Sequence, residues 1–397
     1  MKGLVNIYFS LVVLSVLMSA CGTKKHPYFN KEAANWQDNQ LPQNTKAVHT
    51  LYLIGDAGKM DRYADTSNYV VESMAEMMDM NDKNTTVVFL GDNIYPIGLV
   101  SKQNKEERKK GEKIVYAQLQ PLSNFQGETY IIPGNHDWND DQERGLEAVK
   151  RQEEYIESNF GNSGRVHFYP NMGCGDPEVV RMNEEVVYIF IDSQWWLQNW
   201  NKENKINEGC EIRSREDFLN KMEALFLEYK DEEIICMLHH PIKSNGNHGG
   251  YFSFRQHIFP LAELGVWLPL PVIGSIYPLY RKVKGSTQDN TNNKNQNLTK
   301  GLENMAEKHD LNIVFASGHE HGLEYFENSK IKYIVSGSGA KTSYIQKGGE
   351  AVYAREARGF ARILFYENSE SWLEFYAVNG YEEEPKLEFR TALRKTP

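Results

Sequence analysis

The chain has few cysteines and no surplus of positive charge, and both shortages exclude classes of protein. Its four cysteines in 397 residues exclude a small disulfide-stapled scaffold, and the length predicts one large domain with insertions or two domains. Its 44 basic residues are outnumbered by 54 acidic ones, which gives a formal net charge of -10. Because binding nucleic acid by phosphate neutralisation needs the opposite balance, we expect no nucleic-acid binding.

Long apolar runs are also scarce, and the most prominent one lies at the N-terminus. Residues 4–18 form a mostly apolar run that is too short for a membrane span and predicts an export signal over residues 1–20. The M-S-A-C-G stretch that ends at Gly22 resembles a bacterial lipobox. That resemblance implies acylation of Cys21 and attachment to the bacterial cell envelope, at the outer membrane or in the periplasm. The alternative is an ordinary signal peptide with Cys21 unmodified, and both versions export the protein.

Three cysteines remain in an oxidising compartment if Cys21 is acylated. We predict a disulfide between Cys174, in a glycine-rich turn, and Cys210, in a polar loop. Cys236 lies inside an apolar run and is expected to be buried. The alternative of three free thiols stays open, because cysteine spacing does not determine pairing.

Short apolar runs alternate with helical patterns from residue 48 onward. The runs are rich in β-branched residues and have the length of buried strands. This alternation predicts an α/β layered domain over residues 48–397, preceded by a polar tether over residues 21–47. The expected strands are 48–54, 86–90, 129–132, 186–191, 234–238, 313–316 and 331–335, with a C-terminal β-hairpin at 361–366 and 372–378. The expected helices are 63–80, 105–119, 146–160, 214–229 and 302–308.

Five of the expected strands end in side chains that can bind metal ions. They are followed by G-D-A-G, G-D-N-I-Y, P-G-N-H-D, H-H-P and S-G-H-E-H. Ligands of open α/β sheets bind beyond the carboxyl ends of the strands, and the glycines let the backbone turn sharply there. Each motif alone would be an ordinary turn, helix cap or surface histidine pair, but five in series predict a metal centre.

This series of motifs resembles the calcineurin-like metallophosphoesterases, and among them the purple acid phosphatases. Most of that superfamily begins with D-x-H, whereas this chain has D-A-G at Asp56. The purple acid phosphatases also have D-x-G there, with a tyrosine three residues after the bridging aspartate, and Tyr95 stands three residues after Asp92. The resemblance continues to about residue 325 and includes His248, nine residues after the H-x-P histidine. It implies a four-layered α/β/β/α sandwich of the metallophosphoesterase type.

The resemblance also implies two metal ions that share one carboxylate. The first ion would be bound by Asp56, Asp92, Tyr95 and His321, and the second by Asp92, Asn135, His239 and His319, with His240 as a non-ligand. Carboxylate and phenolate ligands favour Fe(III) at the first site, and amide and imidazole ligands suit Zn(II), Fe(II) or Mn(II) at the second.

The same resemblance assigns the chemistry. A bridging hydroxide would be the nucleophile. His136 would act as general acid or phosphate contact, with Asp137 to orient it, and His248 would be a second acid or phosphate contact. We therefore expect a dinuclear enzyme that hydrolyses small phosphomonoesters, as an acid phosphatase does. The alternatives are a phosphodiesterase or nucleotidase on the same metal site, and a non-catalytic envelope lipoprotein that retains the fold. The complete set of ligands speaks against the second alternative.

An insert at about residues 265–300 separates the last two histidine motifs. Its first part is apolar and rich in proline, and its second part, residues 286–300, is polar. We expect the apolar part to be an extra core element beneath a flexible loop. A lid over the metal site and a patch that touches lipid are the alternatives.

Asp192 follows the fourth expected strand, and we assign it a structural role because a helix cap or turn accounts for it. Trp195, Trp196 and Trp200 come next, and they fit either the wall of a substrate cleft or the core.

Overall fold

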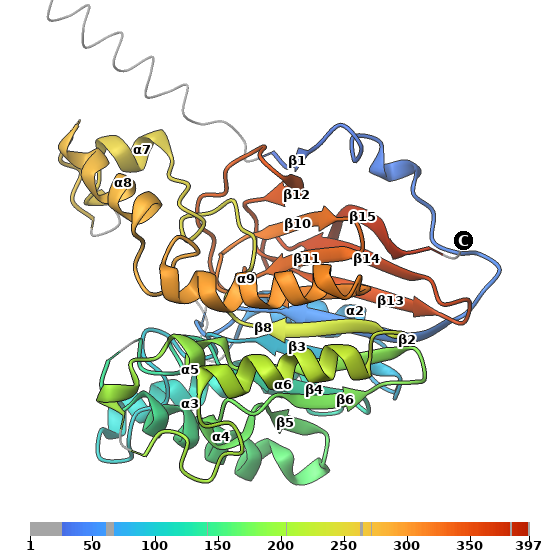
Figure 1. Cartoon of the computed structure of the whole chain (residues 1–397), viewed down its shortest axis with the longest axis horizontal. Helices are drawn as coiled ribbons and strands as arrows, with labels where there is room; N and C mark the ends of the chain where they lie inside the picture. Colours follow the sequence, from blue (N-terminus) through green and yellow to red (C-terminus); the bar gives the residue numbers. More distant parts are fainter. Residues whose placement is uncertain are drawn as a thin grey trace, which may run out of the picture.

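Two β-sheets pack face to face, and helices cover their outer surfaces (Figure 1). This arrangement confirms the expected α/β/β/α sandwich. The computed structural model describes residues 26–60, 67–140, 142–203, 205–262, 265–270, 272–381 and 383–395. The expected export signal and Cys21 lie outside these residues. No helix within the described ranges is long and apolar enough to cross a membrane.

The first sheet has seven strands in the described part of the chain, in the order β15-β14-β13-β2-β3-β4-β5. Its parallel half consists of β2 (Ala47–Ile54), β3 (Thr85–Leu90), β4 (Glu128–Ile132) and β5 (Val166–Phe168). The helices on its outer face are α2 (Tyr69–Met77), α3 (Lys105–Leu119) and α4 (Gly145–Phe160). Its antiparallel half consists of β13 (Gly359–Tyr366), β14 (Ser371–Ala377) and β15 (Lys386–Arg394).

The second sheet has eight strands among the described residues, in the order β1-β12-β10-β11-β9-β8-β7-β6. Its parallel centre consists of β7 (Val186–Phe190), β8 (Glu233–Leu238), β9 (Ile313–Ser317) and β11 (Ile331–Ser336). The antiparallel strands are β1 (Tyr28–Phe29), β6 (Glu178–Arg181), β10 (Leu323–Asn328) and β12 (Ala351–Arg355). The helices on its outer face are α5 (Ser193–Leu197), α6 (Arg215–Glu228) and α9 (Asn293–Lys308).

The parallel strands are buried on both faces because each sheet lies between the other sheet and a helix layer. Along β2, Leu51 and Leu53 pack between the sheets, whereas Tyr52 and Ile54 pack against the helices. Since successive side chains of a strand point to opposite faces, such a strand is apolar at every position. The expected strands and the C-terminal hairpin are therefore present, as their continuous apolar runs predicted.

The last expected helix is longer than predicted. α9 begins at Asn293, inside the polar tract that we expected to be a flexible loop, rather than at residue 302. The side chain of Asn292 caps the helix by accepting a hydrogen bond from the backbone N–H of Lys294 at 2.9 Å, and Leu298 on its first half is buried. Capping and packing therefore form a helix where the composition is typical of a loop.

Part of the expected tether belongs to the folded domain. β1 pairs with β12, so that Phe29 lies opposite Tyr353. The rings of Phe29 and Trp36 each lie 6.2 Å from the ring of Phe389 on β15. The prediction of a tether over residues 21–47 is therefore wrong for the segment from Tyr28 to Trp36, because a two-residue strand carries no periodicity in the sequence.

Cys174 and Cys210 form the expected disulfide, and Cys236 is a free, buried residue of β8. Asp192 has the structural role that we expected. Its carboxylate caps α5 by accepting from the backbone N–H of Trp195 at 2.9 Å, and it also accepts from Nε1 of Trp138 at 2.7 Å. Trp195 is fully buried and belongs to the core.

The insert is not the core element that we expected. Its helix α8 (Ile276–Val283) and the preceding helix α7 (Phe254–Ile258) project from one end of the molecule, at the upper left of Figure 1. The side chains of Trp267, Val272 and Val283 are 56%, 83% and 79% exposed. Its apolar composition therefore reflects an exposed surface rather than a core.

Candidate metal centre

The polar motifs converge at the carboxyl ends of strands from both sheets. In the first sheet, Asp56 follows β2, Asp92 follows β3 and Asn135 follows β4. In the second sheet, His239 follows β8 and His319 follows β9. Ligand atoms of Asp56, Asp92 and His239 all lie within 4.8 Å of one another. The edge where the two sheets meet therefore holds a cluster of side chains that can bind metal.

The backbone at this edge has unusual conformations. Asp56, Asp92 and His319 have φ values of 57°, 55° and 66°, a region that residues other than glycine seldom occupy and that is concentrated at functional sites. Gly91 has a φ of 88°, and a Cβ there would lie 2.5 Å from Nδ1 of His239. The glycine before Asp92 therefore permits the close approach that its position in the motif predicted.

The two carboxylate oxygens of Asp92 face two separate groups of side chains. Oδ2 accepts a hydrogen bond from the Tyr95 hydroxyl at 2.9 Å, and Oδ1 lies 3.3 Å from Nε2 of His239. The Tyr95 hydroxyl also donates to Oδ1 of Asp56 at 2.6 Å. Nε2 of His321 lies 3.2 Å from the same Asp56 oxygen and 3.4 Å from the Tyr95 hydroxyl. Asp56, Tyr95 and His321 thus form one group, joined to the other through Asp92.

The second group consists of Asn135, His239 and His319. Nδ1 of His239 lies 2.8 Å from the carbonyl oxygen of Leu90, and Nε2 of His319 lies 3.1 Å from that of Gln288. Since a carbonyl oxygen only accepts, each of these nitrogens carries the hydrogen, and the other nitrogen of each ring faces inward.

The inward nitrogens lack a matching donor. Nε2 of His239 lies 3.2 Å from Nδ1 of His319 and 3.1 Å from Oδ1 of Asn135. In the neutral form of both rings, acceptor atoms therefore face one another at hydrogen-bond distance and repel. A proton or a cation between them removes this repulsion. Outward N–H groups held by carbonyl oxygens also orient metal-binding histidines, so this group fits a metal ion.

In the absence of a cation, protons on His239 and Tyr95 offset the negative charge of the carboxylates. Burial lowers the pKa of His239, but the carboxylates of Asp92 and Asp56 outweigh it and raise the pKa to about 9. Burial raises the pKa of Tyr95 well above its usual value, and Asp56 and Asp92 raise it further. The phenol thus stays protonated beside the bare carboxylates, and a phenolate ligand needs cations to offset them.

His136 lies at the open side of the cluster with its Nδ1 on the carbonyl oxygen of Pro96. Its Nε2 lies 3.8 Å from Oδ2 of Asp92, and its ring packs edge-on against Tyr95 at 4.5 Å. The expectation that Asp137 orients this ring is wrong. The Asp137 carboxylate accepts from the backbone N–H groups of Gly134, Asn93 and Ile94 at 2.8 to 3.1 Å, because adjacent residues of the turn point in different directions.

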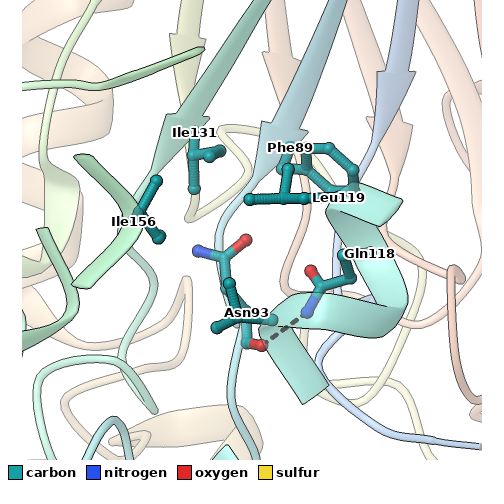
Figure 2. Close-up of a pocket in the computed structure, with 7 residues that line it drawn as sticks. Phe89, Asn93, Gln118, Leu119, Ile131 and Ile156 are labelled. Atoms are coloured by element: carbon teal, nitrogen blue, oxygen red, sulfur yellow. Dashed lines mark hydrogen bonds between the residues drawn. The ribbon is translucent and has the colours of Figure 1, made fainter. Parts of the chain in front are cut away.

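Asp137 instead fixes the loop that carries Asp92. The Asn93 side chain donates to Oδ2 of Asp137 at 3.0 Å, and Nε2 of Gln118 on α3 donates to the carbonyl oxygen of Asn93 at 2.8 Å (Figure 2). Figure 2 shows Phe89, Leu119 and Ile131 on one side of this bond, where they line a small pocket with Asn93 and Gln118. The bond therefore joins the loop to the core behind the site.

The sequence did not reveal the residues that hold His248. The His248 ring lies 4.0 Å from the ring of His319, and its Nδ1 lies 2.9 Å from Oδ1 of the buried Asp289. Nε of Arg281 donates to the other Asp289 oxygen at 2.8 Å. Arg281 and Asp289 both belong to the insert, and no pattern in its Asn-rich, Thr-rich tract distinguishes Asp289 from a loop residue.

Lys341 is a second residue that we did not predict. Its Nζ lies 3.6 Å above the centre of the Tyr95 ring. Burial lowers the pKa of Lys341, and the carboxylates of Asp56 and Asp92 act in the opposite direction. The G-S-G-A-K stretch that follows β11 is a glycine-rich turn after a strand, so the signal that identified the other motifs was present here as well.

The fold and the cluster at the sheet edges are those of a metallophosphoesterase, and the chain belongs to the calcineurin-like phosphoesterase family, whose sequence model matches residues 49–323. Membership of this family points to a metal-dependent phosphoester hydrolase. The chain is similar to purple acid phosphatase 3 of Arabidopsis thaliana, with 21% identity over 357 residues that cover 86% of this chain and 77% of that protein. It is similar to purple acid phosphatase 17 of the same plant, with 21% identity, 82% of this chain and 83% of that protein.

Solved structures share the fold. GAP50, described as the anchor in the inner membrane complex of Plasmodium, aligns with a TM-score of 0.54 and 15% identity over 89% of this chain and 90% of that one. Purple acid phosphatase PPD1 from yellow lupin (Lupinus luteus) seeds aligns with a TM-score of 0.51 and 12% identity over 89% of this chain and 54% of that one.

Proposed function

We propose that the protein is a phosphatase that hydrolyses small phosphomonoesters with two metal ions. The observation that carries this proposal is the position of Asp92, whose two oxygens face two separate groups of donors. One ion would be held by Asp56, Asp92, Tyr95 and His321, and the other by Asp92, Asn135, His239 and His319. The oxygen-rich first group favours Fe(III), and the second suits Zn(II), Fe(II) or Mn(II).

When bound, such a pair of ions supplies a hydroxide nucleophile and neutralises charge on the phosphate. The side chains around the ions bind the ester and protonate the leaving group. His136 has its Nδ1 hydrogen on Pro96, so its Nε2 is free to contact a phosphate oxygen or the leaving oxygen. His248 flanks the second group, and Lys341 adds a positive charge near the first. This extra positive charge favours a monoester dianion over a singly charged diester.

We also propose that the protein is exported and anchored to the cell envelope through acylated Cys21. The apolar run of residues 4–18 and the following M-S-A-C-G stretch support this proposal.

One preparation tests the activity. The full chain is purified in detergent, its metals are measured, and its hydrolysis of p-nitrophenyl phosphate is compared with that of the bis-ester. We expect two metal ions per chain, faster hydrolysis of the monoester, and loss of metal and activity in Asp92→Asn. The same substitution at exposed Asp310, which precedes β9 at the opposite edge of the sheet, is the matched control and should change neither.

Metal-loaded protein that hydrolyses none of a broad panel of phosphate esters would contradict the enzyme proposal. Faster hydrolysis of the bis-ester would favour the diesterase alternative. Iron-loaded protein should absorb visible light through the phenolate, and Tyr95→Phe should abolish that band. Colourless, active protein with only zinc or manganese would exclude the iron assignment.

A further inference from the structure

The insert and the preceding helix α7 carry a large apolar surface that the metal centre does not use. Eleven of the fifteen large hydrophobic side chains exposed in the described part of the chain lie between residues 254 and 283. Contiguous exposed apolar patches of this kind mark interaction surfaces on soluble domains. We call this surface the apolar patch. Its side chains are Phe254, Val266, Trp267, Leu268, Val272, Ile273, Ile276, Tyr277, Leu279, Tyr280 and Val283.

α8 presents its apolar stripe to solvent. Ile276, Leu279, Tyr280 and Val283 have the spacing of one helix face, and their side chains are 64%, 55%, 53% and 79% exposed. On the other side of the helix, Arg281 is paired with Asp289, whose carboxylate also contacts His248 and so joins α8 to the body. An amphipathic helix on a globular domain normally turns its apolar face inward, so the outward orientation of α8 leaves this face available to a partner outside the domain.

The charges around the apolar patch select the partner. Arg255, Lys282 and Lys284 are exposed beside it. In the sequence, residues 252–285 contain four basic residues, counting Arg281, and one acidic residue, Glu263, so the stretch carries a net positive charge. This basic region stands on a chain whose net charge is -10. A second copy with twofold symmetry would bring like charges together, whereas an apolar face with basic flanks is the pattern of an interfacial segment on an anionic membrane.

The N-terminal segment joins the body at the same edge. His26, the first described residue, lines one cleft with Thr342 and Arg355, next to the loop that places Lys341 over Tyr95. The five residue-to-residue steps from Cys21 to His26 span at most about 18 Å when the chain is fully extended. A membrane contacted near the N-terminus is therefore within reach of the edge that holds both the insert and the metal centre.

We propose that the apolar patch binds an anionic lipid bilayer and holds the metal-centre edge of the protein against the membrane. The proposal rests on the geometry and charge of the insert and is independent of the phosphatase proposal.

Amide hydrogen exchange of the full chain tests the docking locally, because the N-terminal segment can bind lipid without the apolar patch. Exchange within α8 is measured in solution, on phosphatidylcholine vesicles, and on vesicles that also contain phosphatidylglycerol. We expect at least roughly tenfold slower exchange on the anionic vesicles, since burying even one large apolar side chain stabilises the helix that much. Protection on the neutral vesicles should be weaker, by about fivefold for each exposed basic residue that contacts the surface.

The double variant Ile276→Glu with Val283→Glu should lose this protection while its unfolding midpoint stays unchanged, because both side chains face solvent. Leu227→Glu, at an exposed apolar position on α6, is the matched control and should keep it. No protection on either vesicle would overturn the proposal. Protection that appears without vesicles and increases with protein concentration would show that the apolar patch binds a second copy of the chain rather than a bilayer. Equal protection on both vesicles would overturn the assignment to an anionic surface.

Discussion

Single residues outside the ligand motifs orient the histidines of the candidate site, and Asp289 is the clearest case. Burial raises the pKa of Asp289, but hydrogen bonds from Arg281 and His248 outweigh it and hold the pKa well below its usual range. The ionised carboxylate therefore fixes Nδ1 of His248, which turns the ring of a histidine from a glycine-rich loop into an ordered group beside His319.

Asp289→Asn keeps the volume of this side chain and removes its charge. Residues that orient the groups of a metal site contribute about 10- to 100-fold to activity, so we expect kcat to fall by that factor on p-nitrophenyl phosphate. Metal content should stay the same, because Asp289 bonds His248 and Arg281 rather than the ligand atoms. Asp310→Asn is the control. Loss of metal together with activity would show that Asp289 supports the ligands, and an unchanged kcat would remove its role in positioning.

Glu233 predicts a pH dependence of stability remote from the site, at the opposite end of β8 from His239. Burial raises its pKa to about 7, although the Ser371 hydroxyl and the charge of Arg394 act in the opposite direction. Since this pKa lies above the ordinary value of 4.5, the stabilising effect of the neutral carboxyl is complete below pH 4.5 and is lost as the pH rises through 7.

Glu233→Gln should remove that loss. Relative to the unmodified chain, the variant should gain on the order of 3 kcal/mol in the free energy of unfolding between pH 4 and pH 8. Urea unfolding across this range measures the difference, and Glu184→Gln at an exposed position is the control. If the difference in unfolding free energy between the variant and the unmodified chain stays constant from pH 4 to pH 8, burial does not raise the pKa of Glu233.

At the scale of elements, the disulfide joins two segments that no sheet connects. Cys174 follows β5 and Cys210 precedes α6, at a sequence separation of 36. Closing a loop of that length lowers the entropy of the unfolded chain, which corresponds to about 3 to 4 kcal/mol of stability. The double variant Cys174→Ser with Cys210→Ser should lose this amount in urea unfolding, and reducing agent should not affect the variant further. A loss below about 1 kcal/mol would show that Asp176, which accepts from the backbone of Ile212, already holds the loop.

Which elements the sequence reveals depends on their burial. The parallel strands were predictable because burial on both faces makes each one a continuous apolar run, as β8 shows. β1 was not, because its two residues acquire their role only by pairing with β12, which follows more than 300 residues later. The apolar composition of the insert was visible in the sequence, but composition does not indicate whether its side chains are covered by the domain or exposed, as those of α8 are.

The residues of the candidate site also divide into those that the sequence predicts and those that it does not. Asp56, Asp92 and His239 were predictable because they directly follow strands, so that the sheet alone brings them together. Asp289 was not predictable, because it reaches His248 through the fold of the insert. Asp137 shows a third case, in which the motif predicts the residue but not the direction of its side chain.

At the scale of the whole molecule, the site joins the two sheets. Asp56, Asp92 and Asn135 come from the first sheet, and His239 and His319 come from the second. Two metal ions between these groups would therefore connect the halves of the sandwich at one edge. Because a ligand that binds only the folded state stabilises it, by about 2.7 kcal/mol at a concentration of 100 times Kd, removing the metals should lower the stability of the entire domain.

The size of this effect should depend on pH through His239. In the metal-free protein its pKa is about 9, above the ordinary value of 6.5, because Asp92 and Asp56 outweigh the effect of burial. The stability that the imidazolium contributes is therefore complete below pH 6.5 and lost as the pH rises through 9, when acceptor atoms again face one another. A bound metal ion makes this proton unnecessary.

The difference in unfolding free energy between metal-loaded and chelated protein should thus increase by on the order of 3 kcal/mol from pH 6.5 to pH 9. Urea unfolding with and without chelator measures it, with His309→Gln as a control that should keep the increase. If the difference is zero or constant across this range, the inward nitrogen of His239 does not bind a metal ion.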